Sequence, residues 1–163
     1  MKEYTPIHEN FVRFCQARAH KVMSYEDLVS EATLKAYQNW EKIKKKDSLN
    51  YFLFTTARNI ILNQVRKKGE EDIEKVDYQI EGAMNSAELD LEIAYLYEQL
   101  NKISEAKREA LILFEINGFS IKEIAVIQDV SEGLVKVNLS RGRKELRALM
   151  TDMPKQAVET VAI

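Results

Sequence analysis

The chain of 163 residues contains few of the residues that interrupt helices and almost no cysteine. With only two prolines and five glycines, it is expected to be all-α, with room for one domain or two small ones. Cys15 is its one cysteine, so an internal disulfide is excluded and a core position for Cys15 is expected. No apolar run reaches the ~18 residues of a membrane span, and the first residues lack the apolar core of a signal peptide. These absences predict a cytoplasmic globular protein.

Sequence signals of an enzyme are missing as well. His8 and His20 are more than one helical turn apart, and a single cysteine cannot build a zinc cluster. The sequence has no P-loop, paired-carboxylate motif or nucleophile elbow. We therefore expect no catalytic activity, no metal and no cofactor, which disfavours a helical nuclease or deaminase.

Charge is unevenly distributed along the chain, although the net charge is only −2. Residues 1–69 hold 13 Lys and Arg against 7 Asp and Glu, whereas residues 70–106 hold 2 against 11. In residues 107–163 the balance is 9 against 8, and the positive charge gathers in one predicted helix. Two basic segments separated by an acidic one suit a nucleic-acid-binding protein, because binding depends on local surfaces rather than on total charge.

The most informative pattern lies near the C-terminus, where two helices are predicted with a very short turn between them. Ser120 and Glu123 form a predicted capping box that starts the first helix, and Ser131 is the predicted N-cap of the second. Asp129 occupies the turn position that often holds glycine. The apolar residues expected to face inward are Ile121, Ile124, Ala125, Val130, Val135, Leu139, Leu146 and Leu149. This pattern predicts a helix-turn-helix, whose second helix enters the major groove of DNA.

The other face of that second helix is polar and basic. It carries Lys136, Asn138, Arg141 and Lys144, with Arg143 and Arg147 nearby. Such a face suits the phosphates and base edges of duplex DNA. A helical hairpin with a solvated basic face is the alternative interpretation, because charged runs on helices commonly face water.

Two helices are predicted at the N-terminus. The first runs from Pro6 to about Lys21, and the second follows its N-cap Ser24. Residues near one face of the first helix are Phe11, Phe14, Cys15 and Arg18. The expected core stripe of the second helix is Leu28, Val29, Ala32, Ala36, Tyr37 and Trp40. Its opposite face carries Asp27, Ser30, Glu31, Leu34 and Lys35, where the exposed leucine is a candidate contact for a partner protein.

A third helix is expected after the basic loop 42–47, with Ser48 as its cap. Its predicted core residues are Leu49, Phe52, Leu53, Ala57, Ile60, Ile61 and Val65. The rest of the helix holds Asn50, Tyr51, Phe54, Arg58, Asn59, Asn63, Arg66, Lys67 and Lys68. Rings interleaved with Arg, Asn and Lys suit single-stranded nucleic acid, because bases stack on rings while cations contact phosphates. The alternative is that Tyr51 and Phe54 belong to the core.

The acidic stretch 70–85 lacks helical periodicity and is predicted to be a flexible linker between domains 1–69 and 86–150. Residues 151–163 form a tail in which no amphipathic helix is predicted.

Two further helices are predicted ahead of the helix-turn-helix. Ser86 starts one, and Ser104 caps the next, which ends at Asn117 and Gly118. Their expected core residues are Leu89, Ile93, Leu96, Tyr97 and Leu100, then Ile103, Ala106, Ala110, Leu111 and Phe114.

Two blocks of the sequence together resemble a known family. The first is EDLVSEATLKAYQNW followed, after the basic loop, by LNYFLFTTARNIILNQVRKK. The second is SEAKREALILFEINGFSIKEIAVIQDVSEGLVKVNLSRGRKELRAL. They are similar to conserved regions 2 and 4 of bacterial RNA polymerase sigma factors of the extracytoplasmic-function (ECF) class. The resemblance covers most of residues 9–150, and the first block is rare outside sigma factors.

This resemblance implies a subunit that binds core RNA polymerase, directs it to promoters and helps to melt the −10 region. The face implied to dock on the clamp helices of the largest polymerase subunit is Asp27, Ser30, Glu31, Leu34 and Lys35. Residues implied to hold the single-stranded −10 element are Lys44, Lys45, Lys46, Asn50, Tyr51, Arg58, Asn59, Asn63 and Arg66. Residues implied to read the −35 duplex are Ser131, Lys136, Asn138, Arg141, Arg143 and Lys144. The polymerase flap and an anti-sigma factor are further implied partners.

The sequence departs from the family pattern at two places. Ser30 stands where the family has Gln, and Leu134, Val137 and Asn138 replace a small polar residue, a Ser and an Arg in the recognition helix. Losing a cation removes a contact to DNA, and a good bidentate base contact contributes about 1–3 kcal/mol of discrimination. We hypothesise that duplex readout is weak or altered and that a further DNA-bound partner helps to choose the promoter.

A stand-alone helix-turn-helix transcriptional regulator is the alternative function. It would bind duplex DNA tightly without polymerase and would need a dimer interface. The sequence shows no zipper and no ligand-binding domain, and a gel shift of the isolated protein distinguishes the two functions.

Overall fold

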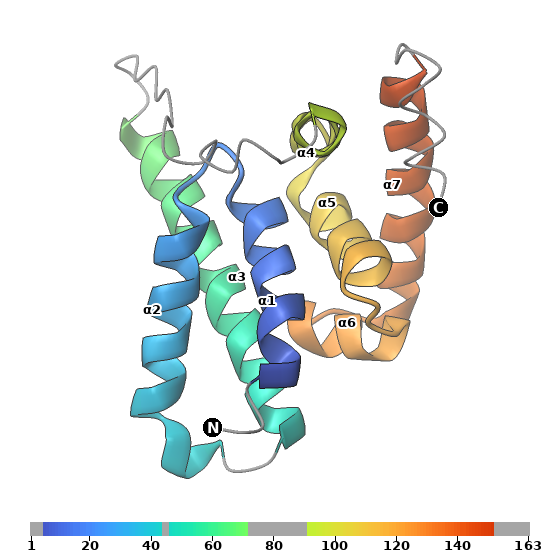
Figure 1. Cartoon of the computed structure of the whole chain (residues 1–163). Helices are drawn as coiled ribbons and strands as arrows, with labels where there is room; N and C mark the ends of the chain where they lie inside the picture. The colour runs from blue at the N-terminus through green and yellow to red at the C-terminus, as the bar shows by residue number, and fades with distance from the viewer. Residues whose placement is uncertain (1–4, 44–45, 72–90, 152–163) are drawn as a thin grey trace.

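A computed structural model describes residues 5–43, 46–71 and 91–151, and every regular element in these ranges is helical (Figure 1). The elements are α1 (Thr5–Ala19), α2 (Tyr25–Gln38), η1 (Trp40–Lys42), α3 (Lys46–Glu71), α4 (Leu91–Asn101), α5 (Glu105–Leu111), η3 (Ile112–Ile116), α6 (Ile121–Gln128) and α7 (Glu132–Met150). The predicted all-α class is confirmed. Within these ranges, no helix is both long and apolar enough to cross a membrane.

The N-terminal helices α1, α2 and α3 pack side by side as a bundle (Figure 1). Phe11, Phe14 and Leu53 are fully buried in its core. Cys15 is also buried, as expected, and burial raises the pKa of its thiol, so the thiol stays protonated. Ser24 caps α2 as predicted, accepting a hydrogen bond of 3.4 Å from the backbone N–H of Asp27.

Three expectations for this bundle were wrong. Val65 was expected in the core of α3, but its side chain is 41% exposed. Tyr37 was expected in the core stripe of α2, but its side chain is 70% exposed. The buried face follows Leu28, Ala32 and Ala36, and one residue further along a helix turns the side chain by about 100° away from that face. Ser48 does not cap α3, because that helix already begins at Lys46.

The C-terminal helices α6 and α7 form the predicted helix-turn-helix. Ser120 Oγ accepts a hydrogen bond from the Glu123 N–H at 3.1 Å, and the Glu123 carboxylate accepts one from the Ser120 N–H at 3.3 Å. This is the predicted capping box. Asp129 turns the chain with φ of 53°, and Ser131 caps α7 by accepting from the Leu134 N–H at 3.1 Å.

The helices before this motif form its support. Gly118, with φ of 73°, ends the preceding helix as predicted. That helix changes from α5 into the π-helical turn η3, which the periodicity did not predict. Ser104 precedes α5 but its side chain makes no capping hydrogen bond. Ala106 was expected in the core but is exposed, because the buried face of α5 follows Glu109, Ala110 and Leu111. Gly142 on α7 lets α5 approach closely, because a Cβ there would lie 3.0 Å from Leu111 Cδ1.

Not all expectations for α4 are met. Its Leu100 is buried and its Leu96 and Tyr97 are half-buried, as the stripe predicted, but Ile93 is 39% exposed. The predicted start at Ser86 lies outside the described residues, as do Leu89, most of the predicted linker 70–85 and the tail beyond Thr151.

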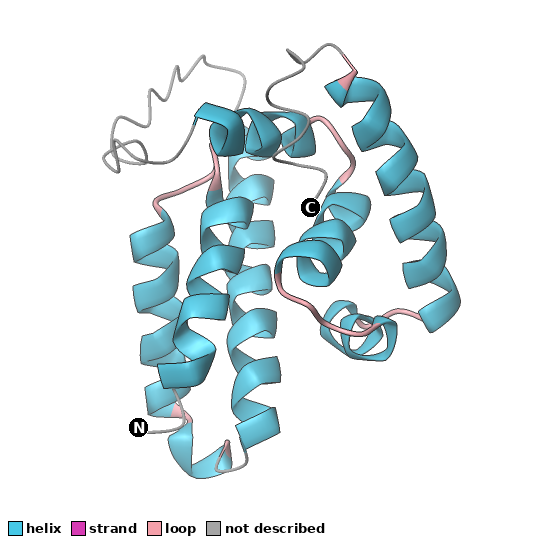
Figure 2. Ribbon diagram, turned by 45° about the vertical axis from the view of Figure 1, so that its right-hand side comes forward, coloured by secondary structure: helices cyan, strands magenta, loops and turns pink. Residues whose placement is uncertain are grey.

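The N-terminal bundle and the C-terminal helices pack directly against each other (Figures 1 and 2). Helix α1 contacts η3, and α3 contacts α6. Phe54 of α3 lies edge-on against Phe119, with ring centroids 4.8 Å apart. Phe54 is fully buried, so it is a core residue rather than a stacking platform for bases. We call this arrangement of α1–α3 against η3 and α6 the closed form.

Candidate nucleic-acid interface

The residues implied to bind polymerase form one exposed strip on α2. Helical spacing of three and four residues brings the five side chains to neighbouring positions. All are exposed, namely Asp27, Ser30, Glu31, Leu34 and Lys35. Leu34 is 56% exposed, which is unusual for a leucine, and it is flanked by the pair Glu31–Lys35 with an Oε1–Nζ distance of 3.4 Å. The strip therefore combines an apolar centre with a charged border, the composition of a protein-binding surface.

The residues implied to bind the −10 strand are only partly accessible. Asn59, Asn63 and Arg66 are exposed along α3. Asn50, Tyr51 and Arg58 are half-buried. Lys44 and Lys45 lie outside the described residues, and the side chain of Lys46 is not described either. The accessible part of this surface is therefore the C-terminal half of α3, while Arg58 is engaged by the C-terminal helices.

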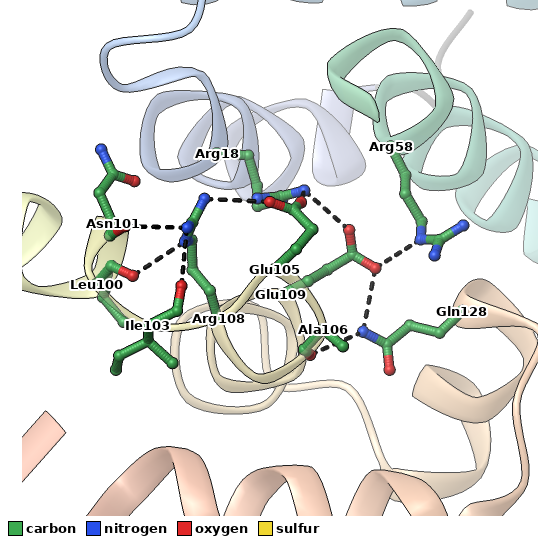
Figure 3. A network of polar contacts seen from close by, with 10 residues as sticks. All are labelled: Arg18, Arg58, Leu100, Asn101, Ile103, Glu105, Ala106, Arg108, Glu109 and Gln128. Atoms are coloured by element: carbon green, nitrogen blue, oxygen red, sulfur yellow. Dashed lines mark hydrogen bonds and ion pairs between the residues drawn. The ribbon is translucent and has the colours of Figure 1, made fainter. Parts of the chain in front are cut away.

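The partner of Arg58 is Glu109 of α5, which is 1% exposed (Figure 3). Arg58 Nε donates to Glu109 Oε1 at 2.6 Å, and Arg18 Nη2 of α1 donates to Glu109 Oε2 at 3.1 Å. Gln128 Nε2 of α6 completes the set at 3.1 Å from Glu109 Oε1. One buried carboxylate thus joins two helices of the N-terminal bundle to two helices of the C-terminal half.

A second carboxylate extends this network. Glu105 accepts from Arg18 and from Arg108 Nη1, the latter at 3.2 Å. Arg108 also donates to the backbone carbonyls of Leu100, Asn101 and Ile103, at 2.9, 3.1 and 2.8 Å. Burial lowers the pKa of Arg108, but the guanidinium stays charged at neutral pH. Arg108 therefore holds the turn between α4 and α5 and fixes the position of Glu105. We call Arg18, Arg58, Glu105, Arg108, Glu109 and Gln128 the closing network.

Weaker polar contacts surround the closing network. The amides of Asn10 and Asn117 donate to each other's backbone carbonyls, at 3.2 and 2.8 Å. Lys21 Nζ lies 2.7 Å from Glu98 Oε1 at an exposed edge. His20 packs against Tyr97, and burial together with Lys21 lowers the pKa of His20. These contacts join the same two halves of the chain at the periphery.

The residues implied to read the −35 duplex separate into two groups on α7. Ser131, Lys136, Arg141 and Lys144 are exposed. Asn138 is 9% exposed and so faces the protein interior rather than solvent. Arg143 is bound by Glu115, with Nη2 to Oε1 at 2.9 Å, and its guanidinium lies 5.1 Å from the Phe114 ring centroid. The face that can approach DNA in this structure is therefore smaller than the predicted set.

Two apolar residues share that face with the exposed cations. Leu134 and Val137 are 44% and 41% exposed. The spacing of Leu134, Val137, Arg141 and Lys144 places all four on one stripe of the helix. The departures from the family pattern at positions 134 and 137 therefore lie on the accessible face, whereas the departure at Asn138 does not.

Comparison with known proteins agrees with this division of the chain. Residues 4–71 match the family of sigma-70 region 2, and residues 93–146 match sigma-70, region 4. The chain is 32% identical over 128 residues to the ECF RNA polymerase sigma factor EcfG of Rhodopseudomonas palustris, covering 77% of this chain and 70% of that protein. The chain belongs to the ECF family of RNA polymerase sigma factors. The family expected from the sequence is thereby confirmed, and with it the function of an alternative sigma factor that directs RNA polymerase to promoters.

Further relatives are similarly distant from this sigma factor. The ECF sigma factor SigM of Bacillus subtilis is 30% identical over 131 residues, covering 76% of this chain and 78% of that protein. Among solved structures, RpoE of Bartonella quintana in complex with the anti-sigma factor NepR has a TM-score of 0.71 at 27% identity, covering 93% and 97% of the two chains. CnrH in complex with the cytosolic domain of CnrY has the same fold, with a TM-score of 0.70 at 20% identity.

The sequence had left one signal of the closing network unused. Arg18 lay near the apolar face predicted for the first helix, and a buried arginine requires a buried anion. Which anion it meets was not readable, because Glu105 and Glu109 follow 87 and 91 residues later.

Proposed function

We propose that this sigma factor divides its work among three surfaces. The exposed strip of α2 binds core RNA polymerase on the clamp helices of its largest subunit, and the C-terminal helices bind the polymerase flap. Helix α3 holds the non-template strand of the melted −10 element. The exposed face of α7 reads the −35 duplex in the major groove. The protein acts in the cytoplasm as a non-enzymatic initiation factor, and the domain boundaries 1–69 and 86–150 follow this division.

The observation that carries the polymerase-binding proposal is Leu34. Leu34 is 56% exposed among charged neighbours, and a partner protein that buries its side chain gains favourable binding free energy. Replacing it with alanine should weaken binding to core polymerase roughly tenfold, the effect of a moderate interface anchor. Val65→Ala is the matched control, because Val65 is an exposed apolar residue at 41% on α3, outside the surfaces proposed to bind polymerase.

Reconstitution tests the function as a whole. Purified sigma factor added to core polymerase should start transcripts on a promoter template, while the sigma factor alone should give no stable gel shift with the same duplex. Tight binding of the isolated protein, with no transcripts from the mixture, would support the alternative regulator instead.

The closed form is the unbound state in this proposal. The −10 and −35 elements are about 25 base pairs apart, which is about 85 Å of duplex at about 3.4 Å per base pair. Helix α3, with 26 residues, is only about 39 Å long, and the C-terminal helices pack against its side. The two DNA-binding surfaces must therefore separate before they can occupy both elements, and core polymerase holds them apart.

An anti-sigma factor is a proposed partner that would act before this separation. RpoE, which has the same fold over nearly all of this chain, was solved with its anti-sigma factor NepR. A protein that binds only the closed form of this sigma factor would keep it inactive, because ligands stabilise the state that they bind.

Promoter choice in this proposal involves a further DNA-bound partner. Asn138 stands where the family has Arg and is buried, so the recognition helix lacks a cation at that point. Footprinting of the reconstituted holoenzyme tests the idea on native promoters. Strong, sequence-specific protection of the −35 region without any helper would contradict it.

A further inference from the structure

The recognition helix exposes two apolar side chains among its cations. Leu134 and Val137 lie in the first two turns of α7, the part of such a helix that reaches base edges. Both keep more than two fifths of their surface exposed while the opposite face, with Val135 and Leu139, is buried. Their exposure therefore does not result from a poorly packed helix.

The charges around Leu134 and Val137 indicate that DNA rather than a protein covers them. Lys136, Arg141 and Lys144 are exposed on α7, and Arg141 and Lys144 continue the stripe of Leu134 and Val137. A protein covering the pair would also have to neutralise these cations, whereas duplex DNA supplies a phosphate row on each side of the major groove. The apolar pair, in the first two turns of α7, thus lies where base edges are read, and the cations after it along the helix are placed for phosphates.

The group in the major groove that an apolar side chain recognises is the C5-methyl of thymine. Among the four bases, only thymine carries a methyl group there. Building on the function proposed above, we propose that Leu134 and Val137 read thymine methyl groups in the −35 element. They give this sigma factor a specificity for T·A pairs that hydrogen-bonding side chains at the same positions would not provide.

The proposal is tested with DNA that lacks only the methyl group. Because the −35 readout proposed above is weak without a partner, the reconstituted holoenzyme first enriches −35 elements from a randomised duplex library over several rounds, with transcripts as the readout. Each thymine of the selected element is then replaced by deoxyuridine, which keeps every hydrogen-bonding group. At one or more positions the affinity should fall about fourfold, the effect of removing one buried methyl group.

Variants of the sigma factor test whether Leu134 or Val137 causes the loss of affinity on deoxyuridine templates. Val137→Ala and Leu134→Ala should each weaken binding to the thymine template by a similar factor. On the matching deoxyuridine template the responsible variant should lose nothing more, because the contact is already absent. Val126→Ala serves as the control on α6, and thermal unfolding checks that all variants fold.

Four results would overturn the proposal. The first three are selected elements with no thymine on either strand, deoxyuridine templates that bind as tightly as thymine templates, and losses from variant and template that simply add. A loss caused by the variants only when cell extract is present, whatever the template, would show a protein occupant instead. Absence of transcripts with wild-type protein on every template would contradict the sigma-factor function itself, which is a separate outcome.

Discussion

The two helices proposed to bind DNA, α3 and α7, differ in how much of their surface the closed form leaves exposed. On α7 the cations Lys136, Arg141 and Lys144 face solvent. On α3 the corresponding cation Arg58 is held by Glu109 at 2.6 Å, although Arg66 further along is exposed. The closed form therefore leaves the proposed duplex-reading surface accessible, while a carboxylate of the same chain occupies part of the proposed single-strand surface.

This difference matches the order of events at a promoter. The exposed face of α7 is available to duplex DNA from the start, whereas the −10 non-template strand becomes available for α3 only after the duplex melts. Glu109 binds Arg58, which is proposed to contact a phosphate of the −10 strand, so we expect the unbound sigma factor to have a reduced affinity for other single strands. Arg18, fully buried, uses only its Nη2 within the described chain and leaves Nε and Nη1 without partners, which costs free energy in the closed form.

The largest expected effect comes from removing the central carboxylate. Glu109→Ala leaves buried Arg18 with Glu105 alone and frees Arg58, and breaking a buried ion pair costs about 3–5 kcal/mol. We expect urea unfolding to show a loss near the lower end of that range, because Glu105 compensates in part. Glu115→Ala is the control, since its pair with Arg143 is exposed and contributes at most about 1 kcal/mol. Equal losses in the two variants would show that the closing network is no stronger than a surface pair.

A milder change at the same residue should alter strand binding. Glu109→Gln keeps the shape but removes the charge that competes for Arg58. Free sigma factor should then bind a −10 non-template oligonucleotide roughly fivefold more tightly, since one charged contact of about 1 kcal/mol becomes available. Fluorescence anisotropy measures this, and the gain should disappear in the double variant with Arg58→Ala. An unchanged affinity would mean that Glu109 does not compete with DNA.

Removing a positive charge from α7 should weaken DNA binding by a similar factor whatever the promoter sequence. Lys144→Ala should weaken holoenzyme binding to all promoters by a similar factor and reduce the slope of log affinity against log salt by about 1, because one phosphate contact is lost. Lys102→Ala, an exposed lysine in the turn before α5, is the control. Filter binding at several salt concentrations measures both. A loss confined to particular sequences would assign Lys144 to base readout.

The smallest effect is expected at the edge of the closed form. Lys21→Ala removes the pair with Glu98, whose partners are 62% and 47% exposed, so the unfolding free energy should change by less than about 1 kcal/mol. Urea unfolding provides the measurement. A larger loss would show that the periphery, rather than Glu109, holds the two halves together.

The local features of the fold were predictable to within a few residues. Ser120 and Glu123 cap α6, and Ser131 caps α7, because both signals act within a single turn of helix. The strip around Leu34 followed from helical spacing in the same way. The errors at Tyr37 and Ser48 occurred at helix ends, where periodicity gives the least information.

The accessibility of the implied DNA-binding residues was not predictable. Arg58 and Arg66 lie on the same helix and were both implied to bind the −10 strand, yet Arg58 donates a hydrogen bond to Glu109 and Arg66 is exposed. Asn138 and Arg141 both read as groove-facing, yet Asn138 turns inward. These outcomes depend on how the helices pack, which no short stretch of sequence encodes.

The sequence by itself determined the caps, the helical faces, the charge of each segment and the family, since each of these depends on residues close together in the chain or on matching blocks. Only the tertiary structure decided that Arg18, Arg58 and Gln128 converge on Glu109, and that Leu134 and Val137 stay exposed. The physical reason is distance along the chain. Arg58 and Arg18 precede Glu109 by 51 and 91 positions, so their contacts with it form only when the two halves of the chain dock. That docking decides which side chains stay exposed.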